Sequence, residues 1–148
     1  MVKKVFNICC DSNTYVSQVN GSETTYYFEW NKLPDGQYKV TFSYMSDDTT
    51  TTLSPVMTLW SNLNSGDSTY QAGNGTASMI NFMGNLFPNV HGVNSFYYAK
   101  ACDNPPTYMY KPNNNFFTIT LRNGLSSTTY STPIAAQYIL MINFELVE

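Results

Sequence analysis

Alternating apolar and polar positions run along most of the chain, and the clearest alternation lies at its end. Within residues 137–147, one set of positions holds Tyr138, Leu140, Ile142, Phe144 and Leu146, and the other holds Ile139, Met141, Asn143 and Glu145. Successive side chains of a strand point to opposite faces, so this pattern predicts a strand with one wholly apolar face. Because that face must be covered, we expect this strand in the middle of a sheet, with earlier strands beside it.

Shorter runs of the same period precede this final strand. They predict extended segments near residues 5–10, 26–30, 38–44, 56–60, 77–83, 94–101, 108–112 and 117–122. The alternation at residues 5–10 is weak and fits either an edge strand or an arm. A helical period is missing from the sequence, apart from one helical turn expected near residues 83–86.

Turn residues separate these runs and suggest how two of them connect. Pro34, Asp35 and Gly36 stand between residues 26–30 and 38–44, and Pro and Gly favour tight turns. We therefore predict a hairpin here, with the apolar faces of both strands on one side. A second turn is expected at residues 86–89, which leaves His91 in a loop.

About eight short strands at regular spacing indicate an all-β sandwich or barrel. The chain of 148 residues is long enough for one domain with a real core. A final strand that pairs centrally with distant strands implies Greek-key connections, and a jelly roll is one way to satisfy them.

The composition adds a hint about the surface. Only 11% of the residues are charged, and Ser, Thr and Asn supply much of the polarity. A surface of hydroxyls and amides costs less to desolvate than one of charges, which suits either an ordinary β domain or a surface buried against partners. The net charge of −3, without a basic stripe, argues against nucleic-acid binding.

The sequence also suggests the cellular compartment in which the protein folds. We expect neither a signal peptide at the N-terminus nor a membrane-inserted segment, because apolar runs are short. The three cysteines are Cys9, Cys10 and Cys102, and this odd count favours free thiols in a reducing compartment over a disulfide framework. The triplets that begin at Asn20 and Asn74 match a glycosylation signal, but we interpret them as turns.

The residue types that carry catalysis or bind metals do not form a recognisable site. His91 is the sole histidine and has no nucleophile motif near it. Cys9 and Cys10 are adjacent on a strand, so they point to opposite faces and do not bind one zinc ion with His91 and Cys102. Asp47 and Asp48 lack further oxygen ligands, and Asp103 is isolated. We therefore predict no catalytic residue, no cofactor and no metal, although a distant pair of carboxylates, as in glycosidases, stays open.

The aromatic residues allow two interpretations. Aromatic side chains are 16% of the chain, and for Trp30, Trp60 and the tyrosines, alternation puts most of the rings on inward faces, in the core. Exposed aromatic rings on a β-sandwich can instead stack on sugars. For that alternative, a carbohydrate-binding or adhesin module, we expect Trp60 or Tyr70, in exposed loops, to be the stacking residue.

Two stretches together resemble a known family. Residues 104–124, which contain Pro105, Pro106, Pro112 and the alternating run at 116–122, resemble the penultimate hairpin of small single jelly-roll capsid proteins of large eukaryotic DNA viruses, the phycodnavirus-like group. Residues 137–146 resemble their final strand, and a loop containing Pro133 lies between the two stretches. The resemblance covers about the last third of the chain and concerns strands more than functional side chains.

The resemblance implies a fold and a function. The expected fold is a single jelly-roll β-sandwich of about eight antiparallel strands over residues 24–148. Residues 1–23 form an N-terminal arm or edge strand, of which residues 2–10 contact the underlying shell. The expected function is that of a penton subunit at five-fold vertices, otherwise a minor capsid protein, without enzymatic activity. Implied partners are identical subunits in a homopentamer, the major capsid protein and other minor capsid proteins, in a virion assembled from protein made in the host cytoplasm.

Overall fold

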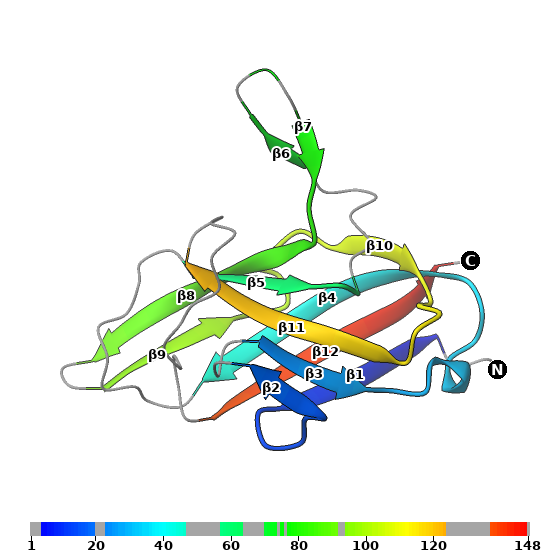
Figure 1. Ribbon diagram of the computed structural model, residues 1–148, viewed down its shortest axis with the longest axis horizontal. Coiled ribbons are helices and arrows are strands. Elements are labelled where there is room, and N and C mark those ends of the chain that lie inside the picture. The colour runs from blue at the N-terminus through cyan, green and yellow to red at the C-terminus, as the bar shows by residue number, and fades with distance from the viewer. Residues whose placement is uncertain are drawn as a thin grey trace.

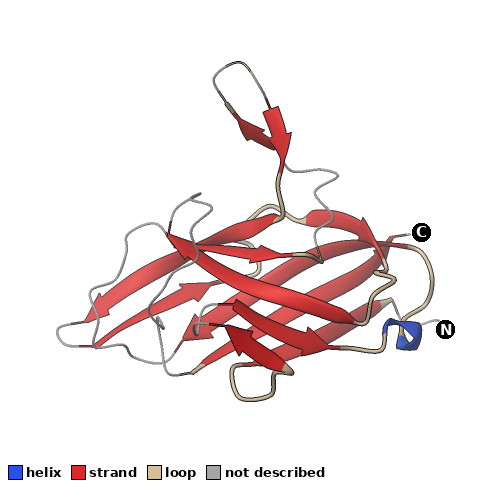
Figure 2. Ribbon diagram, viewed as in Figure 1, coloured by secondary structure: helices blue, strands red, loops and turns tan. Residues whose placement is uncertain are grey.

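The protein is built from β-strands. The computed structural model describes residues 4–19, 23–46, 57–63, 70–73, 75, 77–91, 94–123 and 137–147. The strands are β1 (Val5–Asp11), β2 (Ser17–Val19), β3 (Glu23–Tyr27), β4 (Gln37–Ser46), β5 (Met57–Ser61), β6 (Tyr70–Ala72), β7 (Ala77–Met79), β8 (Phe82–His91), β9 (Asn94–Ala99), β10 (Thr107–Tyr110), β11 (Phe116–Asn123) and β12 (Tyr138–Val147). Within these ranges the sole helix is a 3-10 turn, η1 (Trp30–Lys32). The all-β prediction is confirmed (Figure 2).

Ten of the strands form one antiparallel sheet. Its order is β1-β12-β4-β9-β8-β5-β11-β3-β2, and β10 pairs with the first half of β4. Figure 1 shows that this sheet curls strongly, so that β12 and β4 lie behind β11 and β3 in the view. β6 and β7 form a separate two-stranded hairpin that projects from the rest of the molecule (Figure 1).

The final strand lies where its apolar face predicts. β12 pairs with β1 on one side and with the whole length of β4 on the other. The side chains of Tyr138, Leu140, Ile142 and Phe144 are buried, whereas Ile139 and Met141 are exposed. The prediction of a central final strand is therefore confirmed.

The core lies inside the curl and contains many aromatic rings. The ring of Trp30 is 5.4 Å from Phe144 on β12 and 5.9 Å from Phe117 on β11, measured between centroids. These two strands belong to distant parts of the strand order, so Trp30 joins the two halves of the sheet. Burying an aromatic side chain of this size stabilises a fold by about 2–3 kcal/mol. The interpretation of Trp30 as a core residue is confirmed, since it is 2% exposed.

The predicted hairpin of residues 26–30 and 38–44 is wrong. β3 pairs with β2 and β11, whereas β4 pairs with β12, β9 and β10, so the two strands lie in different parts of the sheet. The connection between them is a corner, because η1 and the residues that follow it carry the chain across the core instead of reversing it. Alternation had identified the two apolar faces correctly but could not identify the strand that each one pairs with.

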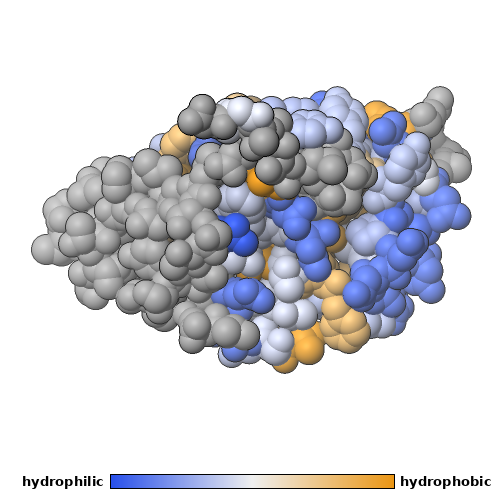
Figure 3. All heavy atoms as spheres, turned by 45° about the horizontal axis from the view of Figure 1, so that its top comes forward, coloured by the Kyte–Doolittle hydropathy of each residue, from blue (hydrophilic) through white to orange (hydrophobic). Residues whose placement is uncertain are grey.

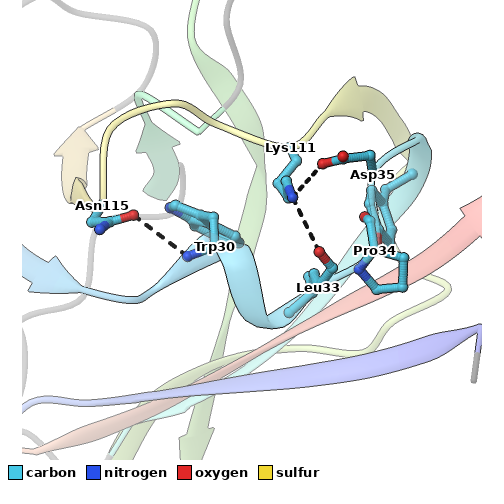
Figure 4. A network of polar contacts seen from close by, with 7 residues as sticks. Trp30, Leu33, Pro34, Asp35, Lys111 and Asn115 are labelled. Atoms are coloured by element: carbon cyan, nitrogen blue, oxygen red, sulfur yellow. Dashed lines mark hydrogen bonds and ion pairs between the residues drawn. The ribbon is translucent and has the colours of Figure 1, made fainter.

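Polar contacts hold this corner in place (Figure 4). The Lys111 ammonium forms an ion pair with Asp35 and donates a hydrogen bond of 3.1 Å to the Leu33 carbonyl. The Tyr38 hydroxyl donates to the Pro34 carbonyl. The Trp30 indole N–H donates to the Asn114 carbonyl at 3.1 Å, so the corner is anchored to the segment before β11.

β8 is longer than the sequence predicts. Residues 86–89 were expected to turn, yet β8 runs through Pro88 to His91. Its first half pairs with β5 and its second half pairs with β9, so β8 joins the two halves of the sheet. Proline is tolerated because, among the described residues, β8 beyond Leu86 pairs with β9 alone, and proline fits a position whose N–H lacks a ladder partner. The predicted helical turn at residues 83–86 and the predicted loop at His91 are also wrong, since both lie in β8.

β1 resolves the choice between edge strand and arm for residues 5–10. It pairs with β12 without a break in register, from Val5 opposite Glu145 to Asp11 opposite Ile139. It is the first strand in the sheet order, so its other side is an edge.

Candidate interaction surfaces

The outer face around β12 carries a row of apolar side chains. Across the strands, Ile139 stands opposite Met45, Met45 opposite Tyr98, and Tyr98 opposite Phe87. Ile139 and Met45 are 53% and 60% exposed, and the rings of Phe87 and Tyr98 lie 6.0 Å apart. Because cross-strand partners share one face, these residues form a continuous strip. We call Met45, Phe87, Tyr98, Ile139 and Met141 the apolar row.

A shallow groove accompanies the apolar row. It has a volume of about 460 Å³ and is lined by Ser43, Tyr44, Met45, Ala99, Lys100, Ala101, Ile139 and Met141. One of these residues, Lys100, is charged. Exposed apolar residues that are contiguous are characteristic of binding surfaces, whereas isolated ones are common on any protein.

A second apolar site lies on the outer face of the other half of the sheet. Tyr27 on β3 stands opposite Phe116 on β11, and their rings meet edge-to-face at 5.2 Å. They are 49% and 48% exposed. Their neighbours Tyr26 and Phe117 are buried, as the alternation of a strand requires. We call Tyr27 and Phe116 the aromatic pair.

The two sites point in opposite directions. Phe144 of β12 and Phe117 of β11 both contact Trp30 in the core, so the inner faces of these strands look toward each other. The apolar row and the aromatic pair occupy the outer faces, on opposite sides of the molecule. On the face drawn in Figure 3, hydrophobic residues form small separate areas between hydrophilic ones.

Of the two residues considered for sugar stacking, Trp60 is buried and Tyr70 is exposed. Trp60 is not in an exposed loop but on β5, and it is 5% exposed. The Arg122 guanidinium lies 4.2 Å from its ring centroid, and its indole N–H donates to the Thr58 hydroxyl at 2.8 Å. Both ring and N–H therefore have partners, and the stacking role predicted for Trp60 is wrong. Tyr70 is 61% exposed, as predicted, but belongs to the β6–β7 hairpin.

The three cysteines weighed for chemistry are free thiols. Cys10 is buried and Cys9 is exposed, which confirms that they point to opposite faces, and Cys102 is an exposed free thiol. Burial raises the pKa of the Cys10 thiol to about 12, so this thiol stays protonated and unreactive at neutral pH. Within the described ranges no group of His, Cys, Asp and Glu has the arrangement of a metal site. Asp47, Asp48, Asn20 and Asn74 lie outside the described residues.

Several buried tyrosines have raised pKa values. Burial raises the pKa of Tyr26, Tyr44 and Tyr138 above the ordinary value of 10.0. The Tyr44 hydroxyl has no hydrogen-bond partner among the described residues, and its ring stacks on that of Tyr138 at 5.4 Å. These phenols lie inside the core and keep their protons at neutral pH, which gives them a structural role.

The sequence alone did not predict the apolar row or the aromatic pair. It placed Ile139 and Met141 on the second face of the final strand, but their neighbours Met45 and Tyr98 come from strands whose pairing it did not predict. It did not single out Tyr27 or Phe116, although both alternate with buried aromatic residues. The usable signal was two adjacent aromatic residues on a strand, because the two rings must then face opposite sides.

Comparison with models of known protein families finds no match, and comparison with curated protein sequences finds no significant similarity. In the part of the chain that the structure describes, no helix is long and apolar enough to cross a membrane. Interpretation of function therefore rests on the fold and on the two surfaces.

Proposed function

We propose that the protein is a single jelly roll and that it serves as a structural capsid protein, namely the penton subunit at five-fold vertices of an icosahedral large DNA virus. A position as another minor capsid protein is the variant of this proposal. Its partners are identical subunits in a ring, the major capsid protein and other minor capsid proteins, and its location is the virion. Its action is mechanical and involves no catalysis.

The strand order supports the jelly roll. Eight strands make up the two halves, β1-β12-β4-β9 and β8-β5-β11-β3. Taken along the chain, β1, β4, β9 and β12 belong to the first half, and β3, β5, β8 and β11 belong to the second. A jelly roll consists of two Greek keys whose strands alternate between two facing sheets in this manner. The short strands β2, β6, β7 and β10 are additions to that plan.

The observation that carries the functional proposal is the pair of apolar surfaces on opposite outer faces. When a surface meets a different surface of the next copy, contacts repeat from head to tail, and a closed ring forms if the rotation per copy allows it. The apolar row and the aromatic pair are different in residues and lie on opposite sides, so they suit such a contact. The low content of charge, 11%, reduces the cost of desolvating the contact.

Light scattering across a concentration series tests the ring. We expect a pentamer or a monomer–pentamer exchange for the native chain. Ile139→Glu alters the apolar row and Phe116→Glu alters the aromatic pair, and each variant is expected to form no pentamer. Tyr110→Glu, at a position that is 71% exposed and belongs to neither surface, is the matched control and should assemble normally.

Mixing the two defective variants separates a head-to-tail contact from a symmetric one. Each variant retains one intact surface, and the two intact surfaces are complementary, so an equimolar mixture should form a dimer but no ring. If Phe116→Glu alone dimerises through its apolar row, or if the native chain is monomeric at every concentration, the ring proposal is wrong. Presence of the protein in purified particles tests the capsid assignment itself.

A carbohydrate-binding or adhesin module is the second proposal, and the exposed aromatic pair favours it. Stacking on sugars needs exposed rings, which Tyr27, Phe116 and Tyr70 offer and Trp60 does not. Binding to a polysaccharide panel that is lost in Tyr27→Ala but retained in Tyr110→Ala would support this proposal. Absence of binding across the panel would remove it.

A further inference from the structure

The free side of β1 is a second kind of interaction surface, made of backbone groups. Leu146 donates its N–H to the Lys4 carbonyl at 2.7 Å, and Ser12 donates its N–H to the Tyr138 carbonyl at 3.2 Å. In an antiparallel ladder, every second residue directs both its N–H and its C=O to the same neighbour. The N–H and C=O groups of the even-numbered residues of β1 therefore point toward β12. The N–H and C=O groups of Val5, Asn7 and Cys9 point away from it.

Those outward groups lack partners among the described residues. At Asp11 the edge is already closed, because its carbonyl accepts hydrogen bonds from the Thr14 N–H and the Tyr26 hydroxyl. For Val5, Asn7 and Cys9, the described residues provide no strand on the outer side of β1, since its sole strand partner is β12. Hydration satisfies such groups, but an ordered strand edge is also a ready template for another strand.

Residues 5–10 of β1 lack the features that normally protect such an edge, and its charged residue, Asp11, lies at the end that is already closed. Proteins discourage edge pairing with prolines, charged side chains or bulges. Residues 5–10 include neither a proline nor a charged residue, and the register with β12 has no bulge. The outward side chains of Val5 and Cys9 are exposed as well. An edge of this length without protection favours pairing with a further strand.

We propose that β1 pairs with β1 of a second copy of this chain, antiparallel and about a two-fold axis at Asn7. In this register Val5 stands opposite Cys9 of the second copy, and Asn7 stands opposite its own equivalent. It is the register that pairs every open position, because shifting it by two residues leaves a position at each end without a partner. A second copy thus satisfies all three open positions at once, because their spacing is symmetric about Asn7.

The side chain of Asn7 also suits this axis. Its Oδ1 accepts a hydrogen bond of 2.8 Å from Asn143 Nδ2, which leaves its own amide N–H groups available. Directly opposed residues of an antiparallel pair have Cα atoms about 5.5 Å apart when they exchange hydrogen bonds. At that separation each Asn7 amide can donate to the Oδ1 of the other, since a carbonyl oxygen accepts two hydrogen bonds. The edge is short, so association is expected to be reversible and to rise with concentration.

Engineered disulfide formation tests this register. In a Cys102→Ser background, which removes the other exposed thiol, Val5→Cys should form a covalent dimer upon oxidation with diamide. Mass spectrometry should show a peptide that joins positions 5 and 9, because the expected Cα separation of about 5.5 Å lies within the range of disulfides. Within one chain these positions are about 13 Å apart along the strand, too far for a bond.

Three controls accompany this variant. The Cys102→Ser parent and Val5→Cys/Cys9→Ser should stay uncrosslinked, because neither presents a thiol opposite another. Val16→Cys, at an exposed position outside β1, should also fail to form a specific dimer. If the Val5→Cys thiol reacts with a maleimide but never links to Cys9, or if Val16→Cys dimerises equally, the proposed pairing is wrong.

A second pair of variants tests the backbone contact without a crosslink. Asn7→Pro removes an N–H that faces the edge and leaves the ladder to β12 intact, whereas Asn7→Ala removes the same side chain but keeps the N–H. Asn7→Pro should reduce the dimer fraction in sedimentation at least several-fold more than Asn7→Ala. Equal effects would overturn the proposal. Circular dichroism should show that both variants fold.

This inference does not depend on the capsid proposal. It involves the free edge of β1, whereas ring assembly involves the apolar row and the aromatic pair. Variants of Ile139 and Phe116 should therefore leave the crosslink between positions 5 and 9 intact, and variants of Asn7 should leave the ring intact.

Discussion

The hydroxyl groups of Tyr26 and Tyr138 lie 2.7 Å apart and form a buried hydrogen bond between strands that are 112 residues apart in sequence. Tyr26 also donates to the Asp11 carbonyl at 3.0 Å, so the Tyr138 hydroxyl is the donor in the pair. This contact joins β3, in one half of the sheet, to β12, in the other. It holds the curl closed near the β1–β2 connection, whereas Trp30 joins the two halves farther along β12, at Phe144.

Removing this contact should destabilise the fold moderately. Tyr138→Phe deletes the donor but leaves Tyr26 bonded to Asp11, so we expect a loss of about 1 kcal/mol in the free energy of unfolding. Urea denaturation followed by fluorescence measures it. Tyr110→Phe, at an exposed position, is the control and should change the free energy by less than about 0.5 kcal/mol. A Tyr138→Phe variant as stable as the native chain would contradict a structural role for the bond.

The protein should lose stability in alkaline solution. Folding raises the pKa of the Cys10 thiol from 9.0 to about 12, so the folded state keeps a proton that the unfolded state releases above pH 9.0. Stability is therefore complete below pH 9.0 and falls as the pH rises toward 12. Each such group contributes a slope of about 1.4 kcal/mol per pH unit within its window, and the buried tyrosines add to it above pH 10.0.

Cys10→Ala isolates the thiol contribution. Denaturant unfolding at a series of pH values measures the free energy of unfolding. Between pH 9.0 and 10.0, where the tyrosines are still protonated in both states, this free energy should fall less steeply in Cys10→Ala than in the native chain. Cys9→Ala provides the comparison at the neighbouring exposed position. Identical pH dependence for Cys10→Ala and the native chain would show that the thiol is not held protonated by the fold.

Lys111 should matter more than its ionic partner Asp35. The Asp35 side chain is 93% exposed, and an ion pair that water reaches this freely adds little stability. Lys111 also donates to the Leu33 carbonyl, which belongs to the corner between η1 and β4. We expect a loss below about 0.5 kcal/mol for Asp35→Asn and of about 1 kcal/mol for Lys111→Met. Thermal unfolding at low and high salt checks the ranking, and a larger loss for Asp35→Asn would reverse it.

Gly84 should not tolerate a larger residue. A Cβ at this position would lie 2.6 Å from the Asn104 side chain and 2.8 Å from the Phe42 ring. Asn104 cannot easily move, because its Oδ1 accepts from the Asn85 N–H at 2.8 Å and its amide donates to the Asn85 carbonyl at 3.1 Å. Gly84→Ala is therefore expected to cost about 1–3 kcal/mol in thermal unfolding.

Gly75 is a partial control for that substitution. A Cβ there would meet nothing within 4 Å, although its positive φ of 98° disfavours alanine. Because Gly75 belongs to the projecting β6–β7 hairpin, the strain of Gly75→Ala should leave the melting of the main sheet nearly unchanged. A larger shift for Gly75→Ala than for Gly84→Ala would contradict the packing argument.

Predictions from alternation succeeded where one strand was considered by itself. The buried face of β12, the burial of Phe117, Ile119 and Leu121 on β11, and the opposite exposure of Cys9 and Cys10 all follow from successive side chains pointing to opposite faces. Such arguments need no knowledge of neighbours. Trp60 is buried, as its position in an alternating run suggests, and it is the alternative stacking role that fails, because both faces of β5 are buried.

Turn chemistry was less reliable than alternation. Pro34 and Gly36 do stand between β3 and β4, but the chain turns a corner there and does not form a hairpin. Pro88 was expected to end a strand, yet β8 continues, because a proline is compatible with the part of β8 that, within the described ranges, has a neighbour on one side alone. In both cases the local residues were compatible with more than one path, and packing of distant strands selected between them.

The sequence by itself determined that this chain makes strands, which side of each strand is apolar, and that the last strand needs a neighbour on both sides. These properties depend on the two-residue period of a strand and on the cost of exposing apolar surface. The tertiary structure decided which strands pair, and hence that Met45, Tyr98 and Phe87 line up with Ile139 and that Tyr27 meets Phe116. Pairing depends on contacts between residues far apart in the chain, which no local period encodes.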